Sequence, residues 1–323
     1  MFLGIEIGGT KLQLGVGEGD GGAAAAMERR AIDPQRGAQG ILEQIAELAP
    51  PLIRAHHVQA IGIGFGGPVD AAAGVVMKSH QVAGWEHFWL TDWCLERFGL
   101  AAYLENDCDA AGLAEARFGA GRGAKVVLYV TVGSGIGGGL VTEGEIFRGQ
   151  GRGAAEIGHL RPGLHAERAD QTVESIASGW GIGSVAQSRV ARASNNSAES
   201  AAAADLRERC GGVLERLTCE IVVRAAGDGN PLAAEVLAEA TQVLGWAIAQ
   251  AITLVGADAV VLGGGVSHAP AELFLEPVRR AAAQYVFPPF AESYRIVPAA
   301  LGESVVVHGA LATAARRHAA AGG

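Results

Sequence analysis

The sequence predicts an α/β protein of two domains with a similar plan and a ligand-binding cleft between them. Segments typical of buried strands alternate with helix-like segments along all 323 residues. The alternation occurs in two runs, and each run begins with two strands joined by a glycine-rich turn. With 49% hydrophobic residues, the chain can form two cores. We expect a smaller N-terminal domain over residues 1–118 plus 303–323 and a larger C-terminal domain over residues 119–302.

The composition favours a soluble, cytoplasmic enzyme. A net charge of −9 disfavours a nucleic-acid surface. The four cysteines form no C-x-x-C pair and no secreted-type framework, which fits a reducing compartment. No signal peptide precedes the first strand, and no uninterrupted apolar run approaches the roughly 18 residues of a membrane span. We therefore expect neither a nucleic-acid partner nor a membrane partner.

The first run opens with a β-hairpin. Phe2–Ile7 has the pattern of a strand, Gly8–Lys11 is a turn, and apolar residues then alternate along a second strand. The turn combines two glycines, a hydroxyl and a lysine, directly after the acidic Glu6. One interpretation is a phosphate-binding loop with a carboxylate near a metal ion. The other is an ordinary hairpin with a surface lysine, and the hairpin alone leaves both open.

The next segments predict a helix and a buried strand that ends at glycines. Residues 38–54 have one apolar face, and Pro50 and Pro51 should break or kink this helix. Residues 58–65 predict a strand, followed by Gly66 and Gly67 at the end where open α/β sheets bind ligands. Four aromatic residues then lie close together, and we interpret them as core or interdomain packing rather than as a sugar platform. They are Trp85, Phe88, Trp89 and Trp93.

A strand over residues 100–105 leads into an alanine-rich helix over residues 108–118. Asn106 or Asp107 is therefore a candidate N-cap, which is a purely structural role. A carboxylate at a helix N-terminus is also kept ionised and oriented, as a general base must be. Both roles stay open for Asp107 at this point.

The central stretch runs from a strand over 126–132 through a loop rich in glycine into a second apolar strand. Glycine removes the Cβ that would block a ligand, and freed amides can form a concave anion site. The residues 133–138 also match the dinucleotide fingerprint G-x-G-x-x-G, which requires a helix starting at its glycines. Three consecutive glycines are a poor helix start, so we favour a hairpin. The sequence contains no P-loop motif.

The second run carries further polar candidates. Glu156 and His159 lie three residues apart, so one helical turn would place them on one face, where they could bind sugar hydroxyls or be ordinary surface residues. Glu174 follows in a short amphipathic turn. We read residues 195–204 as a loop or variable insertion. The remaining predictions are a helix over 231–255, a strand over 259–262, a ligand-side loop over 263–265, and helices over 270–283 and 304–318.

With these motifs located, the sequence resembles the ROK family of sugar kinases and sugar-responsive repressors, which have the actin/hexokinase-like (ribonuclease H-like) fold. The resemblance covers nearly the whole chain and rests on six segments in the family's order. These are Glu6–Lys11, Gly64–Pro68, Glu105–Asp107, Gly133–Gly139, Glu156–His159 and Leu262–Val266.

The resemblance implies an ATP-dependent kinase that phosphorylates a hexose, most simply the 6-OH of glucose or a related sugar. Asp107 would accept the proton of the attacking hydroxyl. Mg²⁺ would neutralise the phosphates, with Glu6 in indirect contact. The other sugar hydroxyls would be held by Gly67, Asn106, Glu156, His159 and Glu174. ATP would be bound by Gly8, Gly9, Thr10, Lys11, Gly133, Ser134, Gly135, Gly137, Gly264 and Gly265.

Three departures from the family pattern matter. The family usually has Asp at the position of Glu6, and Thr at the position of Ser134. Many members carry a cysteine-rich zinc motif before the later Glu, whereas residues 160–173 contain no cysteine. A zinc site needs three or four Cys or His ligands, which His159 and His165 cannot supply. We therefore expect no structural zinc, and the family leads us to expect a homodimer.

Two alternatives remain beside the kinase with ATP. Family repressors carry an additional N-terminal helix-turn-helix, whereas this acidic chain enters its first strand at Phe2, which disfavours a DNA-binding sensor. A kinase that uses polyphosphate is the other alternative, because Arg148 and Arg152 beside the central loop could bind a longer polyanion.

Overall fold

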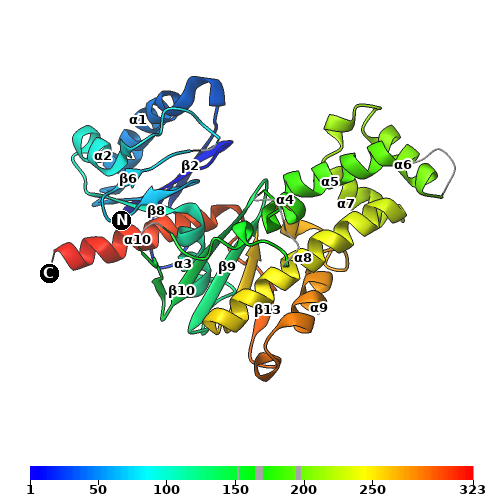
Figure 1. Ribbon diagram of the computed structural model, residues 1–323. Coiled ribbons are helices and arrows are strands. Elements are labelled where there is room, and N and C mark those ends of the chain that lie inside the picture. Colours follow the sequence, from blue (N-terminus) through cyan, green and yellow to red (C-terminus); the bar gives the residue numbers. More distant parts are fainter. Residues whose placement is uncertain (80, 151–152, 164–169, 194–197, 323) are drawn as a thin grey trace. The chain divides into compact units, whose positions relative to one another are not determined.

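The computed structural model describes residues 1–79, 81–150, 153–163, 170–193 and 198–322. The chain divides into two compact units (Figure 1). Unit 1 comprises Met1–Tyr129, Gly139–Ala154 and Ala299–Gly323, and unit 2 comprises Val130–Gly138 and Ala155–Pro298. The division passes through the middle of the central hairpin. The domain limits expected from the sequence stay a prediction.

Unit 1 is built on a five-stranded sheet with the order β3-β2-β1-β4-β8. Its strands are β1 (Phe2–Ile7), β2 (Lys11–Gly17), β3 (Ala26–Ala31), β4 (Ile61–Phe65) and β8 (Ala102–Asn106). β1 and β2 form the predicted antiparallel hairpin, and β4 and β8 run parallel to β1. The carboxyl ends of β1, β4 and β8 therefore meet at one edge of the sheet, the edge at which parallel sheets bind ligands.

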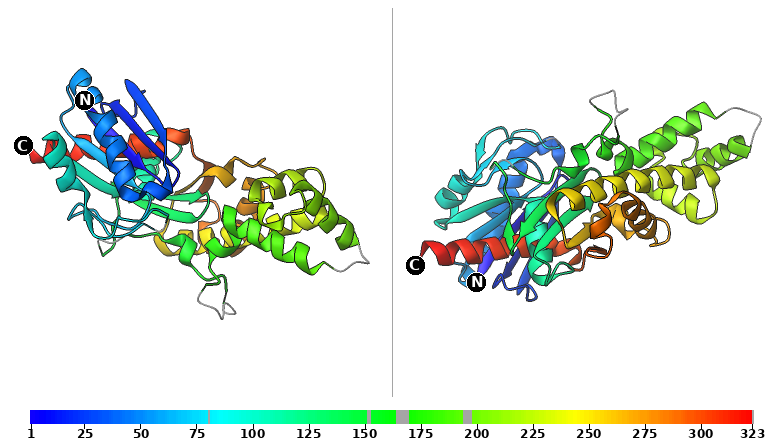
Figure 2. Two further views of the ribbon diagram at one scale, coloured as in Figure 1. Left: turned by 90° about the horizontal axis from the view of Figure 1, so that it is seen from above. Right: turned by 60° about the horizontal axis from the view of Figure 1, so that its bottom comes forward.

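Four α-helices pack among the described residues of unit 1. They are α1 (Gly37–His56), α2 (Leu90–Phe98), α3 (Asp107–Phe118) and α10 (Val305–Ala321). α10 lies against β1, β4 and α3 (Figure 2). A Cβ on Gly309 would collide with the carbonyl of Ala110, and one on Gly62 would collide with the carbonyl of Ala310. Glycine is needed at both positions because the backbones approach so closely.

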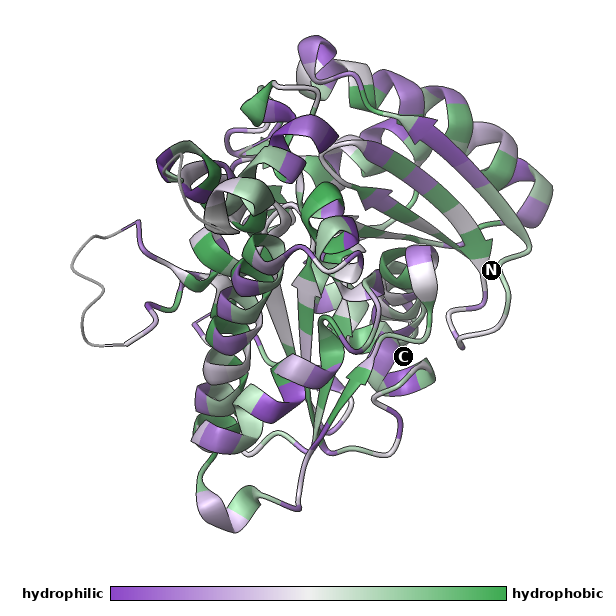
Figure 3. Cartoon of the chain, turned by 90° about the vertical axis from the view of Figure 1, so that its right-hand side faces the viewer, coloured by the Kyte–Doolittle hydropathy of each residue, from purple (hydrophilic) through white to green (hydrophobic). Residues whose placement is uncertain are grey.

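α1 runs unbroken through Pro50 and Pro51, so the predicted break does not occur. Each proline removes a helical hydrogen bond. The helix persists because its apolar face is buried on both sides of the prolines, for example at Ile45 and Leu52. The hydrophobic and hydrophilic residues of this helix can be followed in Figure 3. Tertiary packing here outweighs local propensity.

A small sheet with the order β5-β6-β7 completes unit 1. Its strands are β5 (Val69–Asp70), β6 (Val75–Val76) and β7 (Phe88–Trp89). Trp85 is buried and makes edge contacts with the rings of Phe65 and Phe88, at centroid distances of 5.1 and 5.3 Å. Trp93 also packs against the core. The prediction of core packing is thus right for these residues, whereas Trp89 is 56% exposed.

The second five-stranded sheet has the order β11-β10-β9-β12-β13, the same plan as the first. Its strands are β9 (Val126–Val132), β10 (Ile136–Thr142), β11 (Glu145–Ile146), β12 (Ala259–Gly263) and β13 (Arg295–Pro298). Only three residues connect the neighbouring strands β9 and β10, so they form a hairpin. The chain after Gly135 continues as a strand, and the dinucleotide interpretation, which required a helix there, is wrong.

Unit 2 carries six α-helices among its described residues (Figures 1 and 2). They are α4 (Val173–Ala177), α5 (Gly179–Arg192), α6 (Ala198–Arg209), α7 (Cys219–Gly227), α8 (Pro231–Val255) and α9 (Leu275–Tyr285). α8 has the predicted bounds. By length and composition it could cross a membrane, but most of its apolar stretch is buried inside the protein, as in a core helix.

The loop expected over residues 195–204 is wrong from Ala198 onward, where α6 begins. Residues 194–197 lie outside the described part of the chain. Alanine has the highest helix propensity, which an alanine-rich segment accumulates. Ala203 and Leu206 are fully buried, so the helix is also held by packing.

Candidate active site

Asp107 begins α3, directly after the carboxyl end of β8. The amide of Cys108 donates to Asp107 Oδ1 at 2.9 Å. The other oxygen, Oδ2, faces Gly66, where an added Cβ would lie only 3.3 Å away. Burial of the carboxyl raises the pKa of Asp107 to about 6; the hydrogen bonds from Cys108 oppose the rise, and the charge of Glu6 adds to it. A base with a pKa close to neutrality is suited to proton transfer.

Asn106 holds Asp107 in place. Its Oδ1 accepts hydrogen bonds from the amides of Cys108 at 2.8 Å and Asp109 at 3.3 Å, so Asn106 is the N-cap of α3. Its Nδ2 donates to the carbonyl of Gly67 at 3.0 Å. Of the two candidate caps, the structure selects Asn106. The side chain ties the start of α3 to the glycine loop after β4, and one N–H remains for a ligand.

Glu6 lies on β1 with only 7% of its surface exposed. Gln13 Nε2 donates to Glu6 Oε2 at 2.5 Å, and Lys11 Nζ lies 3.3 Å from Oε1. Burial raises the pKa of Glu6, and the nearby Lys11 opposes this rise. The sequence analysis missed Gln13 as part of the site. In the hairpin, Gln13 on β2 lies directly opposite Glu6 on β1. The length of the turn determines this pairing, so the pairing could have been predicted from the sequence.

The turn between β1 and β2 offers unpaired backbone donors. The amide of Gly8 donates to the carbonyl of Lys11 at 3.1 Å and closes the turn. The amides of Gly9 and Thr10 find no partner among the residues that the structure describes. Neighbouring free amides in a turn form an anion-binding concavity. Gly66 is adjacent, because its amide donates to the carbonyl of Ile7 at 2.8 Å.

The loop between β9 and β10, in unit 2, repeats this arrangement. The amide of Gly133 donates to the carbonyl of Gly135 at 2.9 Å. The amide of Ile136 donates to Glu174 Oε2 at 2.7 Å. Within the described chain, the amides of Ser134 and Gly135 have no partner. Glu174 therefore supports the loop from α4, a role that the sequence analysis did not foresee.

Gly264 and Gly265, also in unit 2, follow β12. Gly264 has a φ of 85°, and a Cβ on it would lie 2.6 Å from the backbone of Val132, so the fold itself requires glycine there. A Cβ on Gly265 or Gly133 would meet no atom within 4 Å, and neither residue has a positive φ. Neither packing nor conformation accounts for these two glycines. Close approach of a ligand to the backbone would account for both.

Glu156, His159 and Glu174 come together within unit 2. His159 ends the short 3₁₀ turn Ile157–His159, and its amide donates to the carbonyl of Glu156 at 3.0 Å. Partial burial of its carboxyl raises the pKa of Glu156; His159 opposes the rise and Glu174 adds to it. Glu156 follows Ala155, which has the uncommon φ of 60°. The predicted helical turn is confirmed.

The remaining predicted residues are placed as follows. Gly137 lies within β10. Arg148 donates to Glu105 and to the carbonyl of Ile146, so its guanidinium is engaged. Arg152 and His165 lie outside the described residues. In the described part of the chain, no three His, Cys, Asp or Glu side chains are grouped to hold a metal ion. The absence of zinc stays a prediction.

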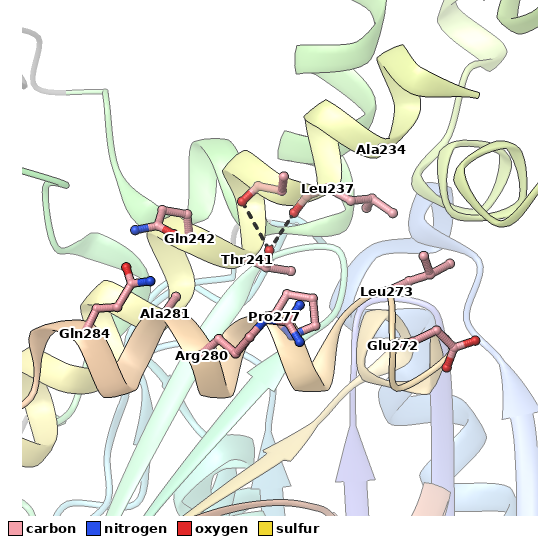
Figure 4. Close-up of a pocket in the computed structure, with 11 residues that line it drawn as sticks. Ala234, Leu237, Thr241, Gln242, Glu272, Leu273, Pro277, Arg280, Ala281 and Gln284 are labelled. Carbon is pink, nitrogen blue, oxygen red and sulfur yellow. Dashed lines mark hydrogen bonds between the residues drawn. The ribbon is translucent and has the colours of Figure 1, made fainter. Parts of the chain in front are cut away.

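A further hollow of about 310 Å³ lies between α8 and α9 (Figure 4). None of the predicted site residues lines it. The hydroxyl of Thr241 is turned to the carbonyls of Leu237 and Ala238, at 2.8 and 3.1 Å. The hollow thus contains none of the glycine-turn amides that characterise the two hairpins.

The fold and the two hairpin turns define a class of protein. Each sheet begins with a hairpin whose turn has two free amides, and unit 1 adds a carboxyl with a pKa of about 6. These features belong to a two-unit α/β protein that handles phosphate groups.

Comparison with known proteins gives the family. The model of the ROK family matches residues 2–317, and the chain belongs to this family. It is 29% identical over 313 residues to the glucokinase of Thermotoga maritima, covering 96% of this chain and 95% of that one. The structure of a ROK family glucokinase from Streptomyces griseus in complex with glucose and AMPPNP superposes with a TM-score of 0.79 at 30% identity, covering 98% and 99% of the two chains.

The likeness in structure confirms the expected fold class, two α/β domains of the actin/hexokinase-like type. The family also includes regulators. A putative xylose repressor of Caldicellulosiruptor sp. is 29% identical over 244 residues, which cover 74% of this chain and 58% of the repressor.

Proposed function

We propose that this protein transfers the γ-phosphate of ATP to the 6-OH of glucose or a closely related hexose. The coarser conclusion, a sugar phosphotransferase that uses ATP, follows from the glucokinase relatives and from the glucose and AMPPNP complex. The observation that carries the proposal is Asp107, whose raised pKa and place beside Gly66 suit a general base at the carboxyl edge of the sheet.

Asp107 would act as the base in the transfer. Its carboxylate would take the proton of the sugar hydroxyl while the hydroxyl oxygen forms the new bond to the γ-phosphorus. The bond between the γ-phosphorus and the bridging oxygen breaks, and ADP leaves with that oxygen. The proton on Asp107 then passes to solvent. Such a transfer depends mainly on positioning and charge, which fixed backbone donors supply.

The free amides of the two turns would hold the phosphates. Gly9 and Thr10 contribute two of these donors, and Ser134 and Gly135 contribute two more. Gly264 and Gly265 would lie beside the adenosine. Lys11 would add positive charge, although part of that charge is balanced by Glu6, 3.3 Å away.

Glu6 fits an indirect role toward Mg²⁺. Carboxylate oxygens are ligands that this ion prefers, and it usually keeps several of its waters. Both oxygens of Glu6 already contact protein donors, Gln13 and Lys11, so a contact through water suits this side chain. The ion would neutralise the negative charge of the phosphates.

The polar residues that the family pattern implies would bind the sugar. Glu156 and His159 could accept and donate hydrogen bonds to hydroxyls. Glu174 has its Oε1 available, because only Oε2 is bonded to the amide of Ile136. Asn106 and Gly67 complete the set from the edge of the first sheet.

The alternatives are less well supported. Arg148, offered for polyphosphate, is engaged by Glu105 and a carbonyl. A sensor without activity would have no need of a base with a pKa near 6 at Asp107. We further propose a cytoplasmic homodimer that binds no nucleic acid; its mass in sedimentation equilibrium would test the oligomeric state.

The decisive experiment is a coupled ADP-release assay with glucose, fructose, mannose, N-acetylglucosamine and N-acetylmannosamine. We expect turnover with glucose or one of its relatives. The same panel with polyphosphate in place of ATP tests the other donor. If every sugar fails with ATP while the protein still binds sugars in calorimetry, the sensor replaces the kinase as the proposed function.

A further inference from the structure

The first backbone amides of α5 donate hydrogen bonds to the central loop, which joins β9 and β10 over residues 133–135. Ser178 caps this helix by accepting the amide of Gly181 at 3.0 Å. The amide of Gly179 donates to the carbonyl of Gly133 at 2.8 Å, and that of Trp180 donates to the carbonyl of Ser134 at 3.3 Å. These first amides of a helix would otherwise be free to bind an anion. Here they fix the loop, and the free donors are the loop's own amides.

Trp180 lies in the first turn of α5, where its amide donates to the carbonyl of Ser134 in the loop between β9 and β10. Its neighbour Gly179 lies close to that loop and to the segment after β12, since an added Cβ would lie 2.9 Å from the carbonyl oxygen of Gly133 and 3.6 Å from Cγ2 of Val266. Side chains of a helix lean toward its N-terminus. The indole in the first turn of α5 therefore leans toward the end of the helix that contacts the central loop.

The indole is unusually exposed. Trp180 has 68% of its surface exposed, more than any other of the five tryptophans in the chain. Trp85, by contrast, is buried with 1% exposed. In the two loops that Gly179 approaches, Gly133 and Gly265 leave open space where a side chain could have stood. An exposed aromatic side chain thus stands in the first turn of the helix whose start approaches the two glycine loops, where backbone positions leave room for a ligand.

We propose that Trp180 stacks on the base of the nucleotide donor and thereby makes the protein prefer donors that have a base. The proposal rests on the proposed function, because it assumes that the two loops bind a nucleoside triphosphate. Stacking of a base on an aromatic side chain is worth about 1–3 kcal/mol. The free amides of Ser134 and Gly135 would contact only phosphates, so they cannot distinguish ATP from inorganic tripolyphosphate.

The test compares two donors in three variants of the full chain. Trp180→Ala should weaken ATP binding about tenfold in calorimetry and raise the KM for ATP similarly, with kcat within about twofold. The inhibition constant of tripolyphosphate against ATP should stay within about twofold. Trp180→Phe, which keeps an aromatic ring, should recover most of the ATP affinity. Trp89→Ala is the matched control, since Trp89 is 56% exposed but belongs to unit 1.

Fluorescence gives a second readout. ATP should quench the tryptophan emission of the wild type and of Trp89→Phe, and this quenching should be lost in Trp180→Phe. Equal weakening of ATP and tripolyphosphate in Trp180→Ala would show that Trp180 supports the loop instead, and unchanged ATP affinity would exclude any contact; either result overturns the stacking. Failure of the wild type to bind ATP at all would overturn the proposed function together with it.

Discussion

The hairpins β1–β2 and β9–β10 both expose backbone amides in their turns, but they are stabilised by different contacts. In each, a short turn leaves two amides free. The hairpin of β1 and β2 carries its own charges, with Glu6 held by Gln13 at 2.5 Å and by Lys11 at 3.3 Å. The hairpin over residues 126–142 contains no charged residue. Its turn is instead stabilised by hydrogen bonds with other segments, namely with Glu174 and with the first amides of α5.

This difference suggests that the two units contribute to different steps, the chemical step and nucleotide binding. Under the proposed function, unit 1 would supply the charged groups of the reaction, because Glu6 is close enough to Asp107 to raise its pKa. Unit 2 shapes a neutral backbone surface, where the shape depends on glycine and on supporting helices. Changes in unit 1 should therefore affect the chemical step, and changes in unit 2 should affect the binding of the nucleotide. The predictions below test this contrast.

The largest effect is expected for Asp107→Asn. The amide keeps the shape of the carboxyl but cannot take a proton, so kcat should fall by about 10²–10⁴-fold. Glucose affinity, measured by calorimetry, should change only a few-fold. A variant that keeps more than a tenth of the wild-type kcat would remove Asp107 from the role of base.

A pair of glycine substitutions examines unit 2. Gly133→Ala meets no neighbour within 4 Å, so the protein should fold with nearly unchanged stability, while the KM for ATP rises about tenfold. Gly264→Ala places a Cβ 2.6 Å from Val132 at a φ of 85°, and should destabilise the protein by about 1–3 kcal/mol. Urea denaturation and ATP titration of both variants separate the effects. The contrast fails if Gly133→Ala loses stability or if its ATP affinity is unchanged.

The pH dependence of kcat/KM for the sugar, which reports the pKa of the free protein, examines unit 1. Because the pKa of Asp107 is raised to about 6, the carboxyl holds its proton below that pH and cannot act as a base. Activity should thus be full above about pH 7 and fall about tenfold at pH 5. The residual activity of Asp107→Asn should lack this inflection. An inflection near pH 4 in the wild type would contradict the influence of burial on Asp107.

Local patterns made the fold predictable, whereas the support of the site depends on contacts between distant segments. The two hairpins, the two candidates for the cap of α3 and the bounds of α8 follow from turn residues and periodicity. The bond from Ile136 to Glu174 joins residues 38 positions apart, and no periodicity indicates it. The same holds for the bonds that α5 donates to the central loop.

Two of the local predictions that failed were decided by packing and by composition. Pro50 and Pro51 predicted a broken helix, but burial of the apolar face of α1 keeps it continuous. The asparagine and serine content of residues 195–204 predicts a loop, but the alanines from residue 198 onward favour the helix that the structure has. Gln13 could have been foreseen from the hairpin register.

The smallest effect is expected for Glu6→Asp, which introduces the residue that the family usually has at this position. The shorter side chain withdraws its carboxylate from Gln13, which now donates to it at 2.5 Å, and from Lys11. If Glu6 acts on Mg²⁺ through water, a shift of one methylene is absorbed by rearranging that water, and kcat should change by about threefold or less. Gln13→Met is the matched control, because it removes the same hydrogen bond and keeps Glu6. If kcat falls more than about a hundredfold for Glu6→Asp but changes little for Gln13→Met, Glu6 is a direct ligand of Mg²⁺. The position of its carboxylate would then matter to within one bond length.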